Sequence, residues 1–147
     1  MKLKSNIVNI NKKNSKFKQK ELSNVLECLD YKNSDKNFVD LLENKFCQIF
    51  KVKYAIACNS GTSALHAAVA SLDLKEDDEI IVPSLAVVMD AYAVIHCNCV
   101  PIFADVDENS FLITADTIKR LINKKTKAII LVSLQGLPVD IDPILKL

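Results

Sequence analysis

Residues 53–74 constrain the fold of this 147-residue chain more than any other stretch. They predict a short apolar strand over residues 54–58, a polar turn over residues 59–62 and a helix from about Ser63. Gly61 in the turn is one of only two glycines in the chain. Because the first turn of a helix has unpaired N–H groups and a partial positive charge, such a joint favours a bound anion. An ordinary N-cap with nothing bound fits the same pattern, and the local sequence leaves both interpretations open.

The composition excludes several classes of protein. Half of the residues are apolar, which is typical of a globular chain and not of a disordered one. The net charge is +1, and lysines gather in residues 1–20, so a strongly basic nucleic-acid-binding body is excluded. No apolar run has the length of a membrane span, and residues 1–14 do not read as a signal peptide. Five cysteines without a CxxC pair indicate reduced thiols, so we expect a cytoplasmic protein that binds neither nucleic acid nor membrane.

Helical and strand patterns alternate along the chain. Helices are predicted over residues 17–29, 38–50, 84–96 and 114–122, with Ser84 and Thr114 as N-caps. Further strands are predicted over residues 80–82, 99–103 and 127–132. This order predicts an α/β fold with three α/β/α layers and a largely parallel sheet. Ligands of such sheets bind at the carboxyl ends of the strands.

The predicted organisation has two parts. Residues 1–37 are expected to form an N-terminal arm and helix, and residues 38–147 are expected to form a partial domain. A last helix begins near Asp142 without a following strand, so we expect the chain to be a fragment.

Four segments, in this order, resemble the DegT/DnrJ/EryC1/StrS family of sugar aminotransferases: VKYAIACNSGTSALHAAVASL, DDEIIVPS, VPIFADVDENSFLI and KTKAIILVSLQGLPVDID. The resemblance covers about residues 38–145. It implies the N-terminal part of the large domain of a type I pyridoxal-phosphate (PLP) transferase, with PLP as the cofactor. It also implies that Ser60, Gly61 and Thr62 hold the cofactor phosphate.

The resemblance implies transfer of an amino group from an amino acid, with glutamate as the expected donor, to a nucleotide-linked keto-sugar. Family members are homodimers, so a homodimer is expected. The family's pyridine-binding acid and Schiff-base lysine would fall beyond Leu147, so we assign no catalytic residue. Lys75 does not substitute, because thirteen helical residues would place it about 20 Å from the phosphate. The alternative is a catalytically inactive truncated or split product that acts as a partner-binding pseudoenzyme.

Four other features of the sequence are candidates for a functional site. Val87 stands near the position at which the family has an aromatic residue that stacks on the cofactor ring. Asp90 is the lone charge of an apolar helix, and we expect a solvent-edge residue rather than an active-site acid. Residues 96–99 (HCNC) have metal-ligand types but no second ligand cluster, so no metal site is predicted. Asp105 and Asp107 resemble the DxD motif of metal-dependent nucleotide-sugar glycosyltransferases, which is the less favoured alternative.

Overall fold

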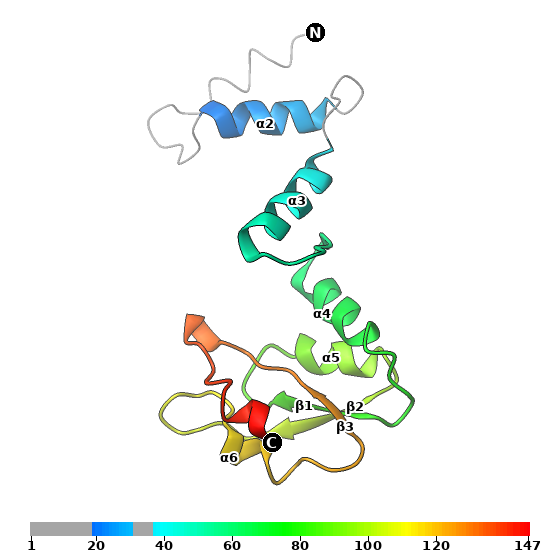
Figure 1. Cartoon of the computed structure of the whole chain (residues 1–147), viewed down its shortest axis with the longest axis vertical. Helices are drawn as coiled ribbons and strands as arrows, with labels where there is room; N and C mark the ends of the chain where they lie inside the picture. The colour runs from blue at the N-terminus through cyan, green and yellow to red at the C-terminus, as the bar shows by residue number, and fades with distance from the viewer. Residues whose placement is uncertain (1–18, 31–36) are drawn as a thin grey trace. The chain divides into compact units, whose positions relative to one another are not determined.

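The computed structural model describes residues 19–30 and 37–147 (Figure 1). The chain divides into two compact units, Met1–Ala57 and Cys58–Leu147. The first unit contains helices α2 (Gln19–Leu29) and α3 (Phe38–Phe50). Both predicted helices are therefore confirmed, although residues 17 and 18 of the first prediction lie outside the described residues. The expected boundary between residues 37 and 38 stays a prediction.

Local capping explains the bounds of α3. Asn37 Oδ1 accepts hydrogen bonds from the N–H groups of Val39 at 3.1 Å and Asp40 at 3.4 Å. These bonds satisfy two of the donors that a helix start leaves unpaired. At the other end Lys51 has a left-handed φ of 53°, and its N–H donates to the carbonyl of Cys47. Both ends of the helix are thus set by side chains and backbone within one turn.

The strand predicted over residues 54–58 is wrong. This segment belongs to no strand and no helix. The Ala57 N–H donates to Glu43 Oε1 at 2.7 Å, and the side chains of Tyr54 and Ile56 are 74% and 83% exposed. A β-strand needs a neighbouring strand for its backbone groups, and the described residues place none beside this segment. The apolar pattern of residues 54–58 does not show whether a neighbouring strand is present.

The second unit is built on three parallel strands. They are β1 (Glu79–Pro83), β2 (Val100–Ala104) and β3 (Thr126–Ile129), in the order β2-β1-β3. Each overlaps a predicted strand, so the expected parallel sheet is confirmed. The pairing of β1 with β3 shifts after Glu79, because Lys127 is an extra residue on β3.

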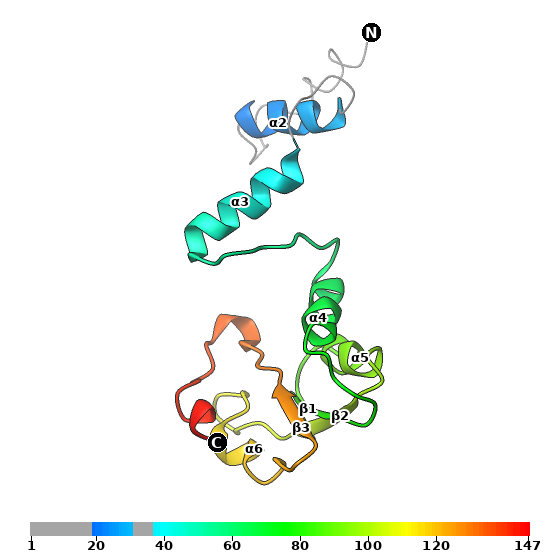
Figure 2. The same cartoon turned by 45° about the vertical axis from the view of Figure 1, so that its right-hand side comes forward.

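The central strand β1 is covered on both faces. Ile80, Ile81 and Val82 are fully buried, and successive side chains of a strand point to opposite faces. Ile80 and Val82 pack in a cluster with side chains from α4 (Gly61–Ala70) and α5 (Met89–Ile95). Ile81 packs in a second cluster with side chains from α6 (Ala115–Ile118) and the 3₁₀ turn η2 (Ile144–Lys146). Figures 1 and 2 show α5 and α6 on opposite sides of the sheet, which confirms the three-layer prediction.

The connections explain why these helices lie on opposite faces. Connections between parallel strands are right-handed in nearly all proteins. The chain moves from β1 to β2 through α5 and then back across β1 to β3 through α6. These two movements have opposite directions, so two right-handed connections must use opposite faces. The connections that follow β1 and β2 therefore diverge at the carboxyl edge of the sheet, where open parallel sheets bind their ligands.

Several helix boundaries differ from the sequence prediction. Helix α5 begins at Met89 and not at Ser84, because the Ser84 N–H donates to the carbonyl of Ala104 at 2.8 Å on β2, and the chain bends over residues 84–86 before the helix starts. The N-cap at Thr114 is confirmed, and it forms a capping box with Thr117, but α6 ends at Ile118. The predicted last helix is the single 3₁₀ turn η2.

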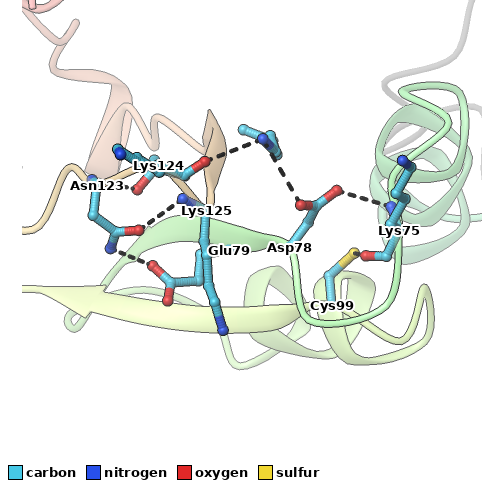
Figure 3. A network of polar contacts seen from close by, with 9 residues as sticks. Lys75, Asp78, Glu79, Cys99, Asn123, Lys124 and Lys125 are labelled. Carbon is cyan, nitrogen blue, oxygen red and sulfur yellow. Dashed lines mark hydrogen bonds and ion pairs between the residues drawn. The ribbon is translucent and has the colours of Figure 1, made fainter.

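Polar contacts bind the loops together at the amino edge of the sheet (Figure 3). Asn123 Nδ2 donates to Glu79 Oε2 at 2.6 Å, and the Lys75 backbone N–H donates to Asp78 Oδ2 at 2.8 Å. The Nζ of Lys127, the extra residue of β3, lies 3.9 Å from Asp78 Oδ1. Lys75 therefore lies at the edge opposite to the carboxyl ends of the strands.

The double burial of β1 leads to a stability prediction. Ile81→Ala should lower the free energy of unfolding by about 2–5 kcal/mol, because it leaves a cavity in a fully buried site. Ile95→Ala is the matched control, since that side chain is 51% exposed, and it should cost less than about 1 kcal/mol. Urea unfolding of the purified chain measures both. If Ile81→Ala does not fold, Ile81→Val should still cost about 0.5–1.5 kcal/mol, and equal losses at positions 81 and 95 would contradict this account of the core.

Candidate functional site

The turn at residues 59–62 begins helix α4. Ser60 is the N-cap and has an extended backbone, with φ −157° and ψ 161°. Its Oγ accepts a hydrogen bond from the Ser63 N–H at 3.1 Å and lies 3.0 Å from Ser63 Oγ. The helix starts at Gly61, earlier than the predicted Ser63. The three residues singled out from the sequence thus form the N-cap and the first two positions of a ten-residue helix.

The backbone N–H groups of Gly61 and Thr62 are open donors. The first helical positions have no carbonyl four residues earlier to accept from them. Among the described residues, the hydrogen bonds of this turn use only the N–H groups of Ser63 and Ala64. The helix dipole adds partial positive charge at the same end. The turn can therefore bind an anion through two backbone donors.

Neither conformation nor packing requires a glycine at position 61. Its φ lies outside the left-handed region, and an added Cβ would meet no heavy atom of the described structure within 4 Å. Gly136 differs, because its φ of +86° disfavours other residues. The open space beside Gly61 allows an anion to approach the backbone closely. Together with the Ser60 and Thr62 hydroxyls, this turn fits a phosphate group.

The segment that begins at the end of β1, residues 83–88, has exposed apolar side chains. Pro83 is buried, whereas Ser84 is exposed and the side chains of Val87 and Val88 are 67% and 53% exposed. This segment lies at the carboxyl edge of the sheet, between the last residue of β1 and the first turn of α5. Among the described residues, no hydrogen bond joins this segment to the turn at residues 60–62.

The expectation that Asp90 is a solvent-edge residue is wrong. Its side chain is 7% exposed and lies in the first turn of α5. Burial raises the pKa of this carboxyl, because desolvation disfavours its charged form. Helix α5 starts later than predicted, so Asp90 lies in its first turn, and the helical periodicity does not show which segments cover this side chain.

The acids of the DxD sequence serve the loop after β2. Asp107 Oδ1 accepts from the Ser110 N–H at 2.8 Å, the Ser110 Oγ at 2.9 Å and the Asn109 N–H at 3.2 Å. The bonds from Ser110 and Asn109 hold the pKa of the Asp107 carboxyl below its usual range. Asp105 Oδ1 accepts from the Val106 N–H at 2.8 Å. These contacts favour a structural role over metal binding.

The histidine of residues 96–99 lies beside the other histidine of the chain. His66 of α4 and His96 at the end of α5 bring their rings together, with centroids 5.5 Å apart. Cys99 is buried, and this burial raises the pKa of its thiol, with a smaller effect of the nearby Cys97 and Asp78. In residues 19–30 and 37–147, no three His, Cys, Asp or Glu side chains converge as a metal cluster. Cys28, Cys47, Cys97 and Cys99 are free thiols.

Comparison with known proteins identifies relatives over most of the chain. The family model described as "DegT/DnrJ/EryC1/StrS aminotransferase family" matches residues 13–147. GDP-perosamine synthase of Caulobacter vibrioides is 41% identical over 124 residues, which is 83% of this chain and 33% of that protein. The chain therefore spans about a third of the length of this relative.

Two solved structures share the fold. An aminotransferase from Psychrobacter cryohalolentis superposes with a TM-score of 0.80 and is 33% identical, over 88% of this chain and 34% of that one. GDP-4-keto-6-deoxy-D-mannose-3-dehydratase of E. coli, with bound hydrated PLP, has a TM-score of 0.80 and 31% identity, over 90% and 36%. The expected type I PLP-transferase fold is confirmed. These relatives support neither the glycosyltransferase alternative nor the inactive pseudoenzyme.

In the described part of the chain, no helix has the length and apolar character needed to cross a bilayer.

The raised pKa of Asp90 predicts a stability that changes with pH. Asp90→Asn should raise the melting temperature near pH 7, because the amide removes a buried charge. A raised folded-state pKa means that stability is lost as pH rises through it. The advantage of the variant should therefore vanish below about pH 4, the range of an unfolded aspartate. Thermal melts of both chains from pH 3 to 8 measure this, and a variant less stable than the parent at pH 7 would contradict it.

Asp107 should show the opposite sign. Asp107→Asn should lower the melting temperature at pH 7, because the hydrogen bonds from Ser110 and Asn109 stabilise the charged carboxylate. A lowered folded-state pKa gives stability that is present above about pH 4 and lost as pH falls through the folded pKa. The two melting curves should therefore converge in acid. A constant difference from pH 3 to 8 would exclude the ionised carboxylate as the cause.

Proposed function

Because the chain belongs to the DegT/DnrJ/EryC1/StrS aminotransferase family, we propose that it binds pyridoxal 5'-phosphate and serves amino transfer to a sugar nucleotide. The amino group comes from an amino acid, with glutamate as the proposed donor, and the acceptor is a nucleotide-linked keto-sugar. A cytoplasmic homodimer is part of the same proposal. The observation that carries it is the open, glycine-containing start of α4.

Ser60, Gly61 and Thr62 would hold the phosphate of the cofactor. The Gly61 and Thr62 N–H groups would donate to phosphate oxygens, and the Thr62 hydroxyl would add a third donor. Hydrogen bonds to a charged group contribute about 1.5–3 kcal/mol each, and the dipole of α4 favours the negative charge. These residues would fix the phosphate end of the cofactor and so restrict where its ring lies.

The ring of the cofactor carries the chemistry. When bound, PLP supplies the carbonyl carbon and the electron-accepting ring through which the amino group passes from donor to acceptor. Val87 is our candidate for contact with one ring face, because it is exposed at the carboxyl edge next to the first turn of α5. An aliphatic side chain excludes water and provides dispersion contacts but no aromatic stacking. The ring would therefore be positioned by other anchors as well.

The acceptor is proposed from the relatives. The synthase of C. vibrioides and the dehydratase of E. coli both have names that specify GDP-linked sugars. A GDP-linked 4-keto-6-deoxyhexose is therefore the first acceptor to test. This choice rests on likeness of sequence and fold, whereas the phosphate-binding turn rests on the geometry of α4.

Substitution of Gly61 tests the phosphate-binding turn. The purified chain should bind PLP in preference to pyridoxal, which lacks the phosphate, and Gly61→Val should weaken PLP binding by about tenfold or more. One lost hydrogen bond to a charged group is enough for this effect. Thr62→Val should act in the same direction. Isothermal titration calorimetry measures the affinities, and circular dichroism verifies the fold.

The control is Ser71→Ala, which removes a hydroxyl at the far end of α4, where Ser71 Oγ donates to the carbonyl of Ala68 at 2.7 Å. This variant should bind PLP like the parent chain. Since a Cβ at position 61 meets nothing in the described structure, Gly61→Val should stay folded. Unchanged PLP affinity in a folded Gly61→Val chain would refute the turn as the phosphate site.

A further inference from the structure

The two histidines of the chain meet where α4 packs against α5. His66 lies in α4, and His96 is the C-cap of α5. Their ring centroids are 5.5 Å apart, with 37° between the ring planes. Both residues are exposed, so this pair of rings lies at the surface of the unit. Figures 1 and 2 both show the two helices side by side.

We propose that His66 and His96 together bind a late first-row divalent metal ion, for which Zn²⁺ is the probe. Neutral imidazole is a favoured ligand of Zn²⁺, Ni²⁺ and Cu²⁺. A Zn–N bond is about 2.0–2.1 Å, and a ring centroid lies about 1 Å from each nitrogen. The centroids of two imidazoles on one tetrahedral ion are therefore about 5 Å apart. The observed centroid distance of 5.5 Å is close to this spacing.

Water completes the coordination shell of such an ion. Within the described ranges no group of three or more protein donors forms a metal cluster, so this site has two protein ligands. Cys97 follows His96 in sequence, but its half-buried side chain packs against the cluster of Val69, Val82 and Val94. The site thus differs from a closed structural zinc site, in which four protein ligands surround the ion.

A bound ion would join α4 to α5. These helices cover one face of β1 through Val69, Ala93 and Val94. Because the histidines come from different helices, only the folded arrangement brings both to one ion. Binding to the folded state alone stabilises it, and free Zn²⁺ at ten times its dissociation constant shifts the folding equilibrium by about elevenfold.

Metal titration of the full chain tests the proposal. Zn²⁺ should bind with one site per chain by calorimetry, and His66→Ala and His96→Ala should each weaken binding by about tenfold or more, because the second ligand no longer acts at high effective concentration. Zn²⁺ should also raise the melting temperature of the parent chain but not that of either variant. Cys97→Ser is the matched control and should keep the parent's affinity.

A second measurement covers the case in which a histidine variant does not fold. In the unmodified chain, Zn²⁺ should protect both imidazoles from acylation by diethyl pyrocarbonate over the same concentration range, as read by mass spectrometry. Protection of one histidine alone would overturn the shared site. The proposal would also be overturned by absence of Zn²⁺ binding, or by binding that Cys97→Ser abolishes and His66→Ala leaves intact.

Discussion

The burial of β1 on both faces is the constraint on which the second unit depends. Its alternating side chains belong to two separate apolar clusters, Ile80 and Val82 on one face and Ile81 on the other. A strand in this position has no solvent-facing side, so helices must cover both faces. Right-handed connections then assign α5 and α6 to opposite faces. Because both faces of β1 must be covered, one connection crosses one face of the sheet and the other connection crosses the opposite face.

The prolines of the sheet agree with this arrangement. Pro83 is the last residue of β1, where loss of an N–H coincides with the end of the ladder. Pro101 lies in β2, which has a neighbouring strand on one side only in the described sheet. A residue without an N–H is tolerated on such a strand because its donor side needs no partner.

Much of the fold could be predicted from the sequence because its signals are local. The ends of α3 depend on residues within one turn, and Thr114 caps α6 through a partner three residues away. The three strands were found for a similar reason, since each is an apolar run of the right length. The phosphate-binding turn was proposed from a serine, a glycine and a threonine that are adjacent in sequence. The donors proposed for the anion all belong to these adjacent residues, so the hypothesis did not depend on a residue distant in sequence.

What the sequence did not reveal depends on distant partners. Residues 54–58 have a strand-like pattern, yet whether they form a strand is decided by a neighbour that no periodicity shows. Asp90 is buried because other segments cover it, and the meeting of His66 with His96 is a product of helix packing. The late start of α5 has the same origin, because the Ser84 N–H is bound to the carbonyl of Ala104, which is twenty residues away in the sequence.

The N-cap of α4 has one further consequence. Ser60 Oγ secures the helix by accepting from Ser63, and the neighbouring amides of Gly61 and Thr62 are the donors offered to an anion. These two donors converge only while the first turn of α4 is formed. Formation of this turn and binding of the proposed anion would therefore be thermodynamically linked. An anion seated there would hold the turn together, and fraying of the turn would release the anion. A change that destabilises the first turn of α4 would then also weaken binding of the anion.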